Sequence, residues 1–288
     1  MVLSLQLLGT LNFKKMRKNI IWIFGLLLFL FVSCEEKFDV DLNSSDPRMV
    51  VEAKLTNKDR NQIIHLSRTV NFDSENFDPI SDAVVKVVAS NGRVFTFTSK
   101  GNGEYTHSNF AVNNYLTYTL DIEHNNKTYE GKAKMPEYVE IDSMGVTKED
   151  IFREIYYFVN LKFRDPVNVP NYYIYEVSIN DGPFKFNIAF NDKFNDGQEV
   201  THQIGGRNQD FKAGDKIIVR RQLVSKDVYT YWNEFQSTNP GSAAPGNPTS
   251  NLSNNALGYF GISNQREYSV VIQDDDVLNQ DEVKSSAR

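Results

Sequence analysis

The sequence predicts an all-β fold of two tandem β-domains, the second of which carries one helix. Apolar and polar residues alternate in many short runs, which is the pattern of half-buried strands. Asparagine, glycine and proline separate these runs, as they do at turns between antiparallel strands. The 255 residues from Cys34 onward are enough for two cores, because single domains are commonly about 100 to 150 residues long.

The N-terminus has the parts of a secretory signal. Arg17 and Lys18 precede an uncharged apolar run over residues 20–32, and Ser33 follows as a small residue. A helix of that run would span roughly 20 Å, which is too short for the ~30 Å hydrocarbon core of a bilayer. We therefore expect residues 1–33 to be a signal peptide, with Met16 as an alternative start.

Cys34 is the only cysteine of the chain and stands where a lipoprotein signal peptidase requires its lipid-bearing residue. We expect it to be lipidated, and two or more acyl chains hold a protein stably on a membrane. The residues before it are bulkier than in the usual lipobox, so an uncleaved anchor or ordinary cleavage is the alternative. No disulfide can then form, and stability must come from core burial.

Residues 34–46 are expected to form a lipidated tether. Glu35, Glu36 and Asp39 make it acidic. This run resembles an export signal that directs lipoproteins to the outer face of the outer membrane, and a plain solvated tether fits it equally well. Removing the four basic residues of the signal changes the formal net charge from −6 to −10. Such an acidic chain is unsuited to nucleic acid.

The first β-domain is expected over residues 47–136. Its clearest strand is 115–124, in which Leu116, Tyr118, Leu120 and Ile122 share one face. A hairpin turn at Asn125-Asn126 should follow. Further strands are expected at 49–55, 61–68, 83–89, 94–99 and 128–133. These strands predict an antiparallel sandwich that ends near Met135-Pro136.

The second β-domain is expected over residues 137–272. Strands are predicted at 156–163, 172–180, 184–190, 216–224, 256–261 and 268–272. A helix is predicted over 225–237, with Ser225 as its N-cap. Its aromatic stripe includes Tyr231 and Trp232 and should pack the helix onto a sheet, with a ligand platform as the alternative. Residues 273–288 are expected to be a flexible tail.

The segment 236–255 carries no charged residue. Loops of this length are usually functional or disordered, and an uncharged loop loses little on desolvation by a partner. We therefore take Pro240, Pro245, Pro248 and Asn251 as candidate partner-binding residues. The alternative is that this loop caps the aromatic core of its own domain.

The sequence indicates no catalytic residue, no metal site and no cofactor. The four histidines lack metal-ligand spacing, and nucleophile and phosphate-binding motifs are missing. The run Asp192–Gly197 partly resembles a calcium loop, but Phe194 stands where a second oxygen ligand is needed. We therefore expect a protein that is not an enzyme.

The order of short motifs resembles a family of envelope lipoproteins catalogued as domain of unknown function 4249. The motifs that carry this resemblance are Cys34 with its lipobox, then 49–53, 80–87, 103–105, 118–120, 127–129, Met135-Pro136, 163–166, 171–173, 247–251 and 258–261. The first half also resembles an immunoglobulin-like or carboxypeptidase-regulatory-like sandwich, a fold without chemistry of its own.

This resemblance implies an outer-membrane lipoprotein that faces the cell surface and is often encoded beside a TonB-dependent transporter. It implies no catalytic residues. The leading hypothesis is a non-enzymatic surface lipoprotein that is the accessory or binding partner of such a transporter. The alternatives are an adhesin or structural envelope protein and, less favoured, a glycan-active enzyme.

Overall fold

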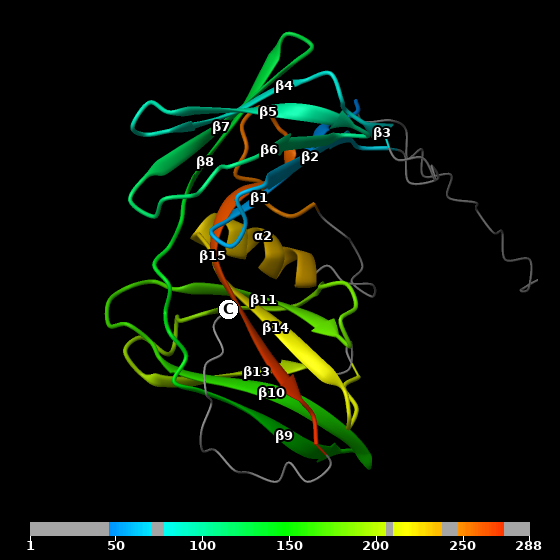
Figure 1. The fold of residues 1–288 in the computed structure, drawn as a ribbon, viewed down its shortest axis with the longest axis vertical. Coiled ribbons are helices and arrows are strands. Elements are labelled where there is room, and N and C mark those ends of the chain that lie inside the picture. The colour runs from blue at the N-terminus through cyan, green and yellow to red at the C-terminus, as the bar shows by residue number, and fades with distance from the viewer. Residues whose placement is uncertain (1–45, 71–77, 206–209, 238–246, 274–288) are drawn as a thin grey trace, which may run out of the picture. The chain divides into compact units, whose positions relative to one another are not determined.

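The computed structural model describes residues 46–70, 78–205, 210–237 and 247–273. Cys34, the acidic run Glu35–Asp39, Pro240, Pro245 and the predicted tail from residue 274 onward lie outside these ranges. The described residues form strands β1 to β15 and the helix α2 (Figure 1). The predicted all-β class is therefore confirmed. No helix in the described ranges is long and apolar enough to cross a membrane.

The first core is built by the N-terminal strands. They run in the spatial order β1-β2-β6-β5-β4-β7-β8, and β3 pairs with β2. Their bounds are β1 Met49–Thr56, β2 Gln62–Arg68, β3 Asp78–Pro79, β4 Val84–Ala89, β5 Val94–Gly101, β6 Glu104–His107, β7 Thr117–His124 and β8 Lys127–Lys134. All these neighbours pair antiparallel, as the sequence predicted.

Alternating burial explains why these segments are strands. In β7 the side chains of Tyr118, Leu120 and Ile122 are buried, while their neighbours on the opposite face are more exposed. Asn125 and Asn126 both adopt positive φ, 49° and 59°, which is the geometry of a tight hairpin turn from β7 to β8. The predicted hairpin is confirmed.

The first sheet folds over so that β8 lies back against the C-terminal part of the chain. A Cβ atom on Gly131 of β8 would come within 2.8 Å of Leu252 Cδ2 and 3.1 Å of Phe260 Cβ. Only glycine allows this close approach. The buried side chains of β1, β2, β4, β5 and β7 fill the space between the two layers, which makes this half a β-sandwich.

The second core lies between a separate three-stranded sheet and four strands that continue the sheet of the first half. The three-stranded sheet contains β13-β10-β9, and the four strands are β12-β11-β14-β15. The bounds are β9 Ser143–Ile151, β10 Glu154–Arg164, β11 Tyr172–Ile179, β12 Lys185–Asn191, β13 Glu199–Gly205, β14 Lys216–Leu223 and β15 Leu257–Val271. Tyr173, Tyr175 and Val177 of β11 are buried in this core, as their alternation predicted. β9 and β13 were not predicted.

The helix α2 spans Lys226–Ser237 and covers the other face of β11 and β12. The Ser225 hydroxyl accepts a weak hydrogen bond from the Val228 N–H at 3.5 Å, and its carbonyl accepts one from the Tyr229 N–H at 3.0 Å. Trp232 stacks on Phe186 of β12 with ring centroids 4.7 Å apart. The predicted helix and its packing onto a sheet are confirmed.

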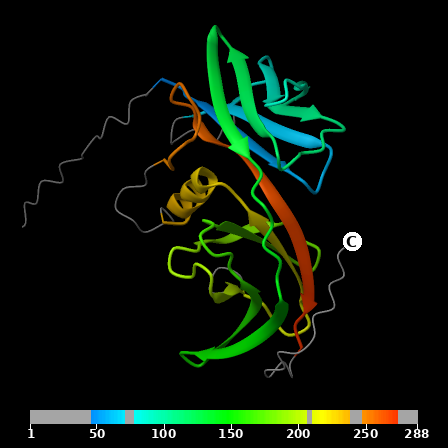
Figure 2. The same ribbon diagram turned by 90° about the vertical axis from the view of Figure 1, so that its left-hand side faces the viewer.

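The C-terminal strand departs from the prediction. Segments 256–261 and 268–272 were expected as separate strands closing the second domain, but both belong to the single strand β15. Its first half pairs in parallel with β1, from Val50↔Leu257 to Thr56↔Ser263, and its second half pairs antiparallel with β14. Figure 2 shows this long strand running from one core to the other. One sheet of twelve strands therefore contains elements of both halves.

We predict that Gly258→Ala is far more damaging than Gly92→Ala. Both glycines have left-handed backbone angles, with φ of 83° and 85°. A Cβ on Gly258 would lie 1.9 Å from the carbonyl oxygen of Val51, whereas nothing lies within 4 Å of one on Gly92. An alanine in the left-handed conformation therefore costs both variants about the same, roughly 1–2 kcal/mol of folding free energy. Forced overlap should cost Gly258→Ala about 1–3 kcal/mol more in urea unfolding. Equal losses would show that β1 and β15 do not need this close approach.

Candidate functional site

The uncharged segment leaves and rejoins the fold at one helix. It begins in the last turn of α2, and on its return the N–H of Thr249 donates to Glu234 Oε2 at 2.5 Å. The Thr249 hydroxyl donates to Glu234 Oε1 at 3.1 Å. Ser237 and Thr249, which flank residues 238–248, therefore both lie at the C-terminal half of α2. We call the group Glu234, Phe235, Pro248 and Thr249 the α2 surface.

Stacked aromatic rings support the α2 surface from below. The Phe235 side chain is 48% exposed. Its ring makes edge contacts with Trp232, at 5.4 Å between centroids, and with Phe186, at 6.2 Å. Trp232 is in turn stacked on Phe186. These contacts hold an exposed aromatic ring on a regular element, so little side-chain entropy would be lost when a partner covers it.

The remainder of the uncharged segment packs on its own molecule. The Asn251 side chain donates to the Phe260 carbonyl at 2.7 Å and accepts from the Phe260 N–H at 3.0 Å. Leu252 bridges to Gly131, and the Ser253 hydroxyl accepts from the Glu130 N–H at 2.8 Å. This part thus covers the edge of β8 in the first core, and not the aromatic core of the second domain that the capping alternative named. Of the candidate residues, Pro248 lies in the α2 surface and Asn251 in the cap, and partner binding by either stays a prediction.

A cluster of paired charges lies next to α2 and connects four strands. Glu176 contacts Lys54 at 2.5 Å and Arg220 at 3.1 Å, and Arg220 also contacts Glu267 at 3.0 Å. Burial acts to raise the pKa of Glu176, but the charges of Lys54 and Arg220 outweigh it and lower that pKa below its usual value. Glu176 is therefore a permanent anion and is unsuited to general acid catalysis near neutral pH.

A small pocket opens between this charge cluster and the helix. Its lining includes Lys54, Glu176, Gln222, Trp232 and Tyr259. The Gln222 side chain is 1% exposed, and its Nε2 atom has no hydrogen-bond partner among the described residues. Because the charges around it are already paired, the pocket has the character of a structural void beside α2 and not of a reactive centre.

An arginine is buried in the second core, which the sequence analysis missed. Arg221 is 0% exposed, donates from Nε to the Tyr175 hydroxyl at 3.1 Å and from Nη1 to the Val139 carbonyl. The rings of Phe163 and Tyr173 face its guanidinium at 4.4 and 4.7 Å. This arginine is held by dipoles and aromatic rings, and no carboxylate pairs with it in the described part of the chain.

His202 lies beside this arginine and is not a free base or ligand. Burial, together with the Arg221 charge, lowers the pKa of His202 to about 3. Its Nδ1 is 2.8 Å from the Tyr175 hydroxyl, and its ring stacks on Phe190 at 4.2 Å. The imidazole is therefore neutral and part of the aromatic core.

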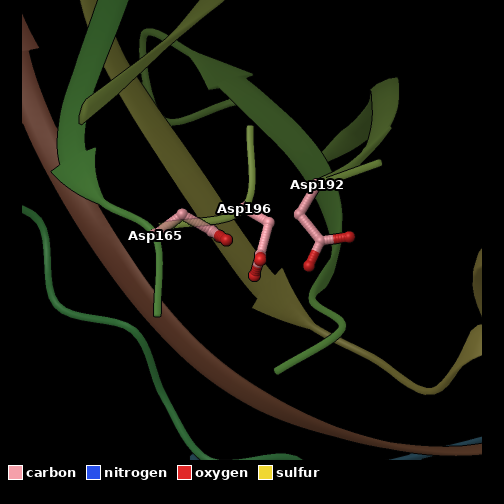
Figure 3. A group of neighbouring side chains, drawn as sticks. All are labelled: Asp165, Asp192 and Asp196. Atoms are coloured by element: carbon pink, nitrogen blue, oxygen red, sulfur yellow. The ribbon is translucent and has the colours of Figure 1, made fainter. Parts of the chain in front are cut away.

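Three carboxylates converge at one end of the second core. Asp165 follows β10, while Asp192 and Asp196 lie between β12 and β13. Figure 3 shows the three side chains lying close together. One ligand oxygen from each lies within 4.8 Å of the others. Asp192 and Asp196 belong to the run that partly resembles a calcium loop, whereas no sequence pattern predicted that Asp165 joins them.

These features define an all-β protein with two cores, one covering helix and no assembled catalytic constellation among the described residues. The sequence profile of a family described as "Domain of unknown function (DUF4249)" matches residues 35–269. The chain belongs to this family. No curated protein matches the chain.

Among solved structures, a two-domain fibronectin type-III segment from chicken tenascin is similar to this chain. The identity is 12%, and the similarity covers 62% of this chain and 91% of the tenascin segment. The TM-score is 0.19, so this similarity carries no argument about fold or function.

Proposed function

We propose that the protein is a non-enzymatic, lipid-anchored envelope protein whose folded part binds a TonB-dependent transporter at the outer membrane. The observation that supports the proposed lipid anchor is the apolar N-terminal segment followed by Cys34, the only cysteine of the chain. The family match begins one residue later, at residue 35. The described residues start at 46, and residues 34–46 are the proposed tether.

The proposed contact with the transporter is the α2 surface together with residues 236–247, which carry no charge. An uncharged segment can be covered without the cost of burying unpaired charges, which is several kcal/mol for each ion. The bonds between Glu234 and Thr249 limit the conformations of the segment before binding. Phe235 adds an aromatic anchor of the kind that is enriched in binding hot spots. The transporter itself is implied by the family resemblance.

The anchor is tested by metabolic labelling with a fatty-acid analogue. We expect label on the wild type and none on Cys34→Ser, because the thiol is the acylated group. A variant with Glu35, Glu36 and Asp39 changed to alanine should keep the label and lose access to protease added to whole cells. Label on Cys34→Ser, or none on the wild type, would refute lipidation. Unchanged proteolysis of the triple variant would make the acidic run a plain tether.

The partner is tested by affinity purification from solubilised outer membranes with quantitative mass spectrometry. We expect the wild type to retain a TonB-dependent transporter and Phe235→Ser to lose at least about tenfold of it, since hot-spot truncations cost about 2 kcal/mol or more. Phe152→Ser is the matched control. This phenylalanine is 86% exposed and does not belong to the α2 surface, because it lies in the turn between β9 and β10.

A second variant separates binding from folding. Residues 239–246 are replaced by a Gly-Ser linker, which leaves the Glu234 and Thr249 anchor in place. The melting temperature should stay within a few degrees of the wild type while the transporter is lost. Retention of the transporter by both variants would move the contact elsewhere. Recovery of surface proteins of other cells instead would favour an adhesin.

A further inference from the structure

Two loops interlock at the end of the second core. The Asp196 Oδ1 atom accepts from the Asn168 N–H at 2.7 Å, and the Asp192 Oδ2 atom accepts from the Asn171 N–H at 2.7 Å. In return, the Asp165 N–H donates to the Gln198 carbonyl at 2.8 Å. The loop between β10 and β11 is thereby fixed to the loop between β12 and β13. Together the two loops bring the three carboxylates of Asp165, Asp192 and Asp196 close to one another.

Asp165 is the member of the cluster that loop folding does not explain. Its side chain is 2% exposed, and its Oδ1 atom accepts from the Tyr173 hydroxyl at 3.0 Å. Its Oδ2 atom is buried and has no hydrogen-bond partner among the described residues. Figure 3 shows this carboxylate pointing toward Asp196. A buried carboxylate oxygen without a partner is costly, so a missing ligand is the direct physical explanation.

The three carboxylates have no ion-pair partner among the described residues, because no lysine, arginine or histidine there pairs with Asp165, Asp192 or Asp196. Burial raises the pKa of the Asp165 carboxyl, and the negative charges of Asp192 and Asp196 raise it further, against the opposing hydrogen bonds from the Tyr173 hydroxyl and the Gly197 backbone. The carboxylates therefore repel one another unless a cation lies between them.

We propose that Asp165, Asp192 and Asp196 form a calcium-binding site that clamps the two loops together. All three ligand oxygens lie within 4.8 Å of one another. Oxygens this close can share one ion, because two oxygens on one calcium ion can be up to about 5 Å apart. Calcium is favoured over magnesium because it accepts irregular sets of protein oxygens, whereas magnesium demands near-ideal octahedral geometry and keeps several waters. Hard carboxylate oxygens also disfavour softer transition metals.

In the sequence, Phe194 argued against a calcium loop because it stands where an oxygen ligand is needed, and the structure shows that another residue can supply this ligand. Phe194 occupies the ligand position of a calcium loop, but its side chain is 81% exposed and is not needed as a donor. Asp165 takes that role from another loop. Carbonyl oxygens and water complete the six to eight ligands that calcium prefers. The ion would hold together the ends of β10 and β13 in one sheet and the ends of β11 and β12 in the other.

The site is tested on the full chain, purified in detergent and stripped with a chelator. Calcium chloride at about a hundred times its dissociation constant should raise the melting temperature by roughly 5–10 °C, with a much smaller effect of magnesium. Terbium, which replaces calcium, should show luminescence excited through Tyr173, whose hydroxyl is 3.0 Å from Asp165 Oδ1. Excess calcium should quench this luminescence.

The variant Asp192→Asn/Asp196→Asn separates a metal site from a structural cluster. An asparagine oxygen can still accept from the Asn168 and Asn171 N–H groups, so the loops should fold. In chelator this variant should melt at or above the wild type, because the repulsion is reduced, and calcium and terbium responses should vanish. The control Glu130→Gln/Glu137→Gln makes the same charge change at exposed positions and should keep both responses.

Two results would overturn the proposal. If millimolar calcium leaves the wild-type melting temperature and terbium luminescence unchanged while the double asparagine variant melts lower in chelator, the three carboxylates form a structural cluster only. Calcium and terbium responses that persist in that variant would place the ion elsewhere. Neither result bears on the lipid anchor or the α2 surface.

Discussion

The rest of the structure depends on one strand that belongs to two cores. In its first half β15 pairs with β1 and contributes Phe260 and Ile262 to the first core. In its second half it pairs with β14 and brings Val270 against the second core. The parallel pairing with β1 requires Gly258, since any side chain there would overlap the Val51 carbonyl. Unfolding of either core would unpair its half of β15 and disturb the other half. We therefore infer that both halves fold as one cooperative unit.

The helix α2 and the charge cluster reinforce this connection. Tyr259 of β15 packs against Tyr231 of the helix, with ring centroids 4.9 Å apart. Lys54 of β1 pairs with Glu176 of β11, so an ion pair also joins strands from the two halves. Partly buried pairs of this kind add little net stability but penalise arrangements that leave one partner alone. The α2 surface therefore rests on a base fixed by both cores, which favours a rigid binding element.

Much of this fold follows from local sequence rules, and the remainder depends on distant contacts. Alternation predicted β7 and β11, and the stripe with Tyr231 and Trp232 predicted the helix. The first half of β9 has no alternation of burial and no residue of β9 is fully buried, so its pattern carried little strand signal. The parallel partner of β15 is about 200 residues away in sequence, as the pairing Val51↔Gly258 shows, and no local pattern encodes it.

The site residues show the same division. Arg221 lies on the same face of β14 as the buried Ile217 and Val219, so alternation alone predicts that it points inward. Arginine is almost never fully buried in proteins, which is why the sequence analysis did not place it in the core. Asp192 and Asp196 were visible as a motif, whereas Asp165 joins them only because two loops interlock. Spacing rules detect ligands on one loop and cannot detect a ligand set assembled from two.

The most direct test of the central claim is native-state hydrogen exchange at increasing urea concentrations, followed for amides of β2 in the first core and β10 in the second. The shared strand predicts that both sets reach the same free energy of opening and the same dependence on urea as global unfolding. If the amides of β2 and β10 instead converge on two different free energies with smaller urea dependences, the halves unfold separately and β15 does not unite them.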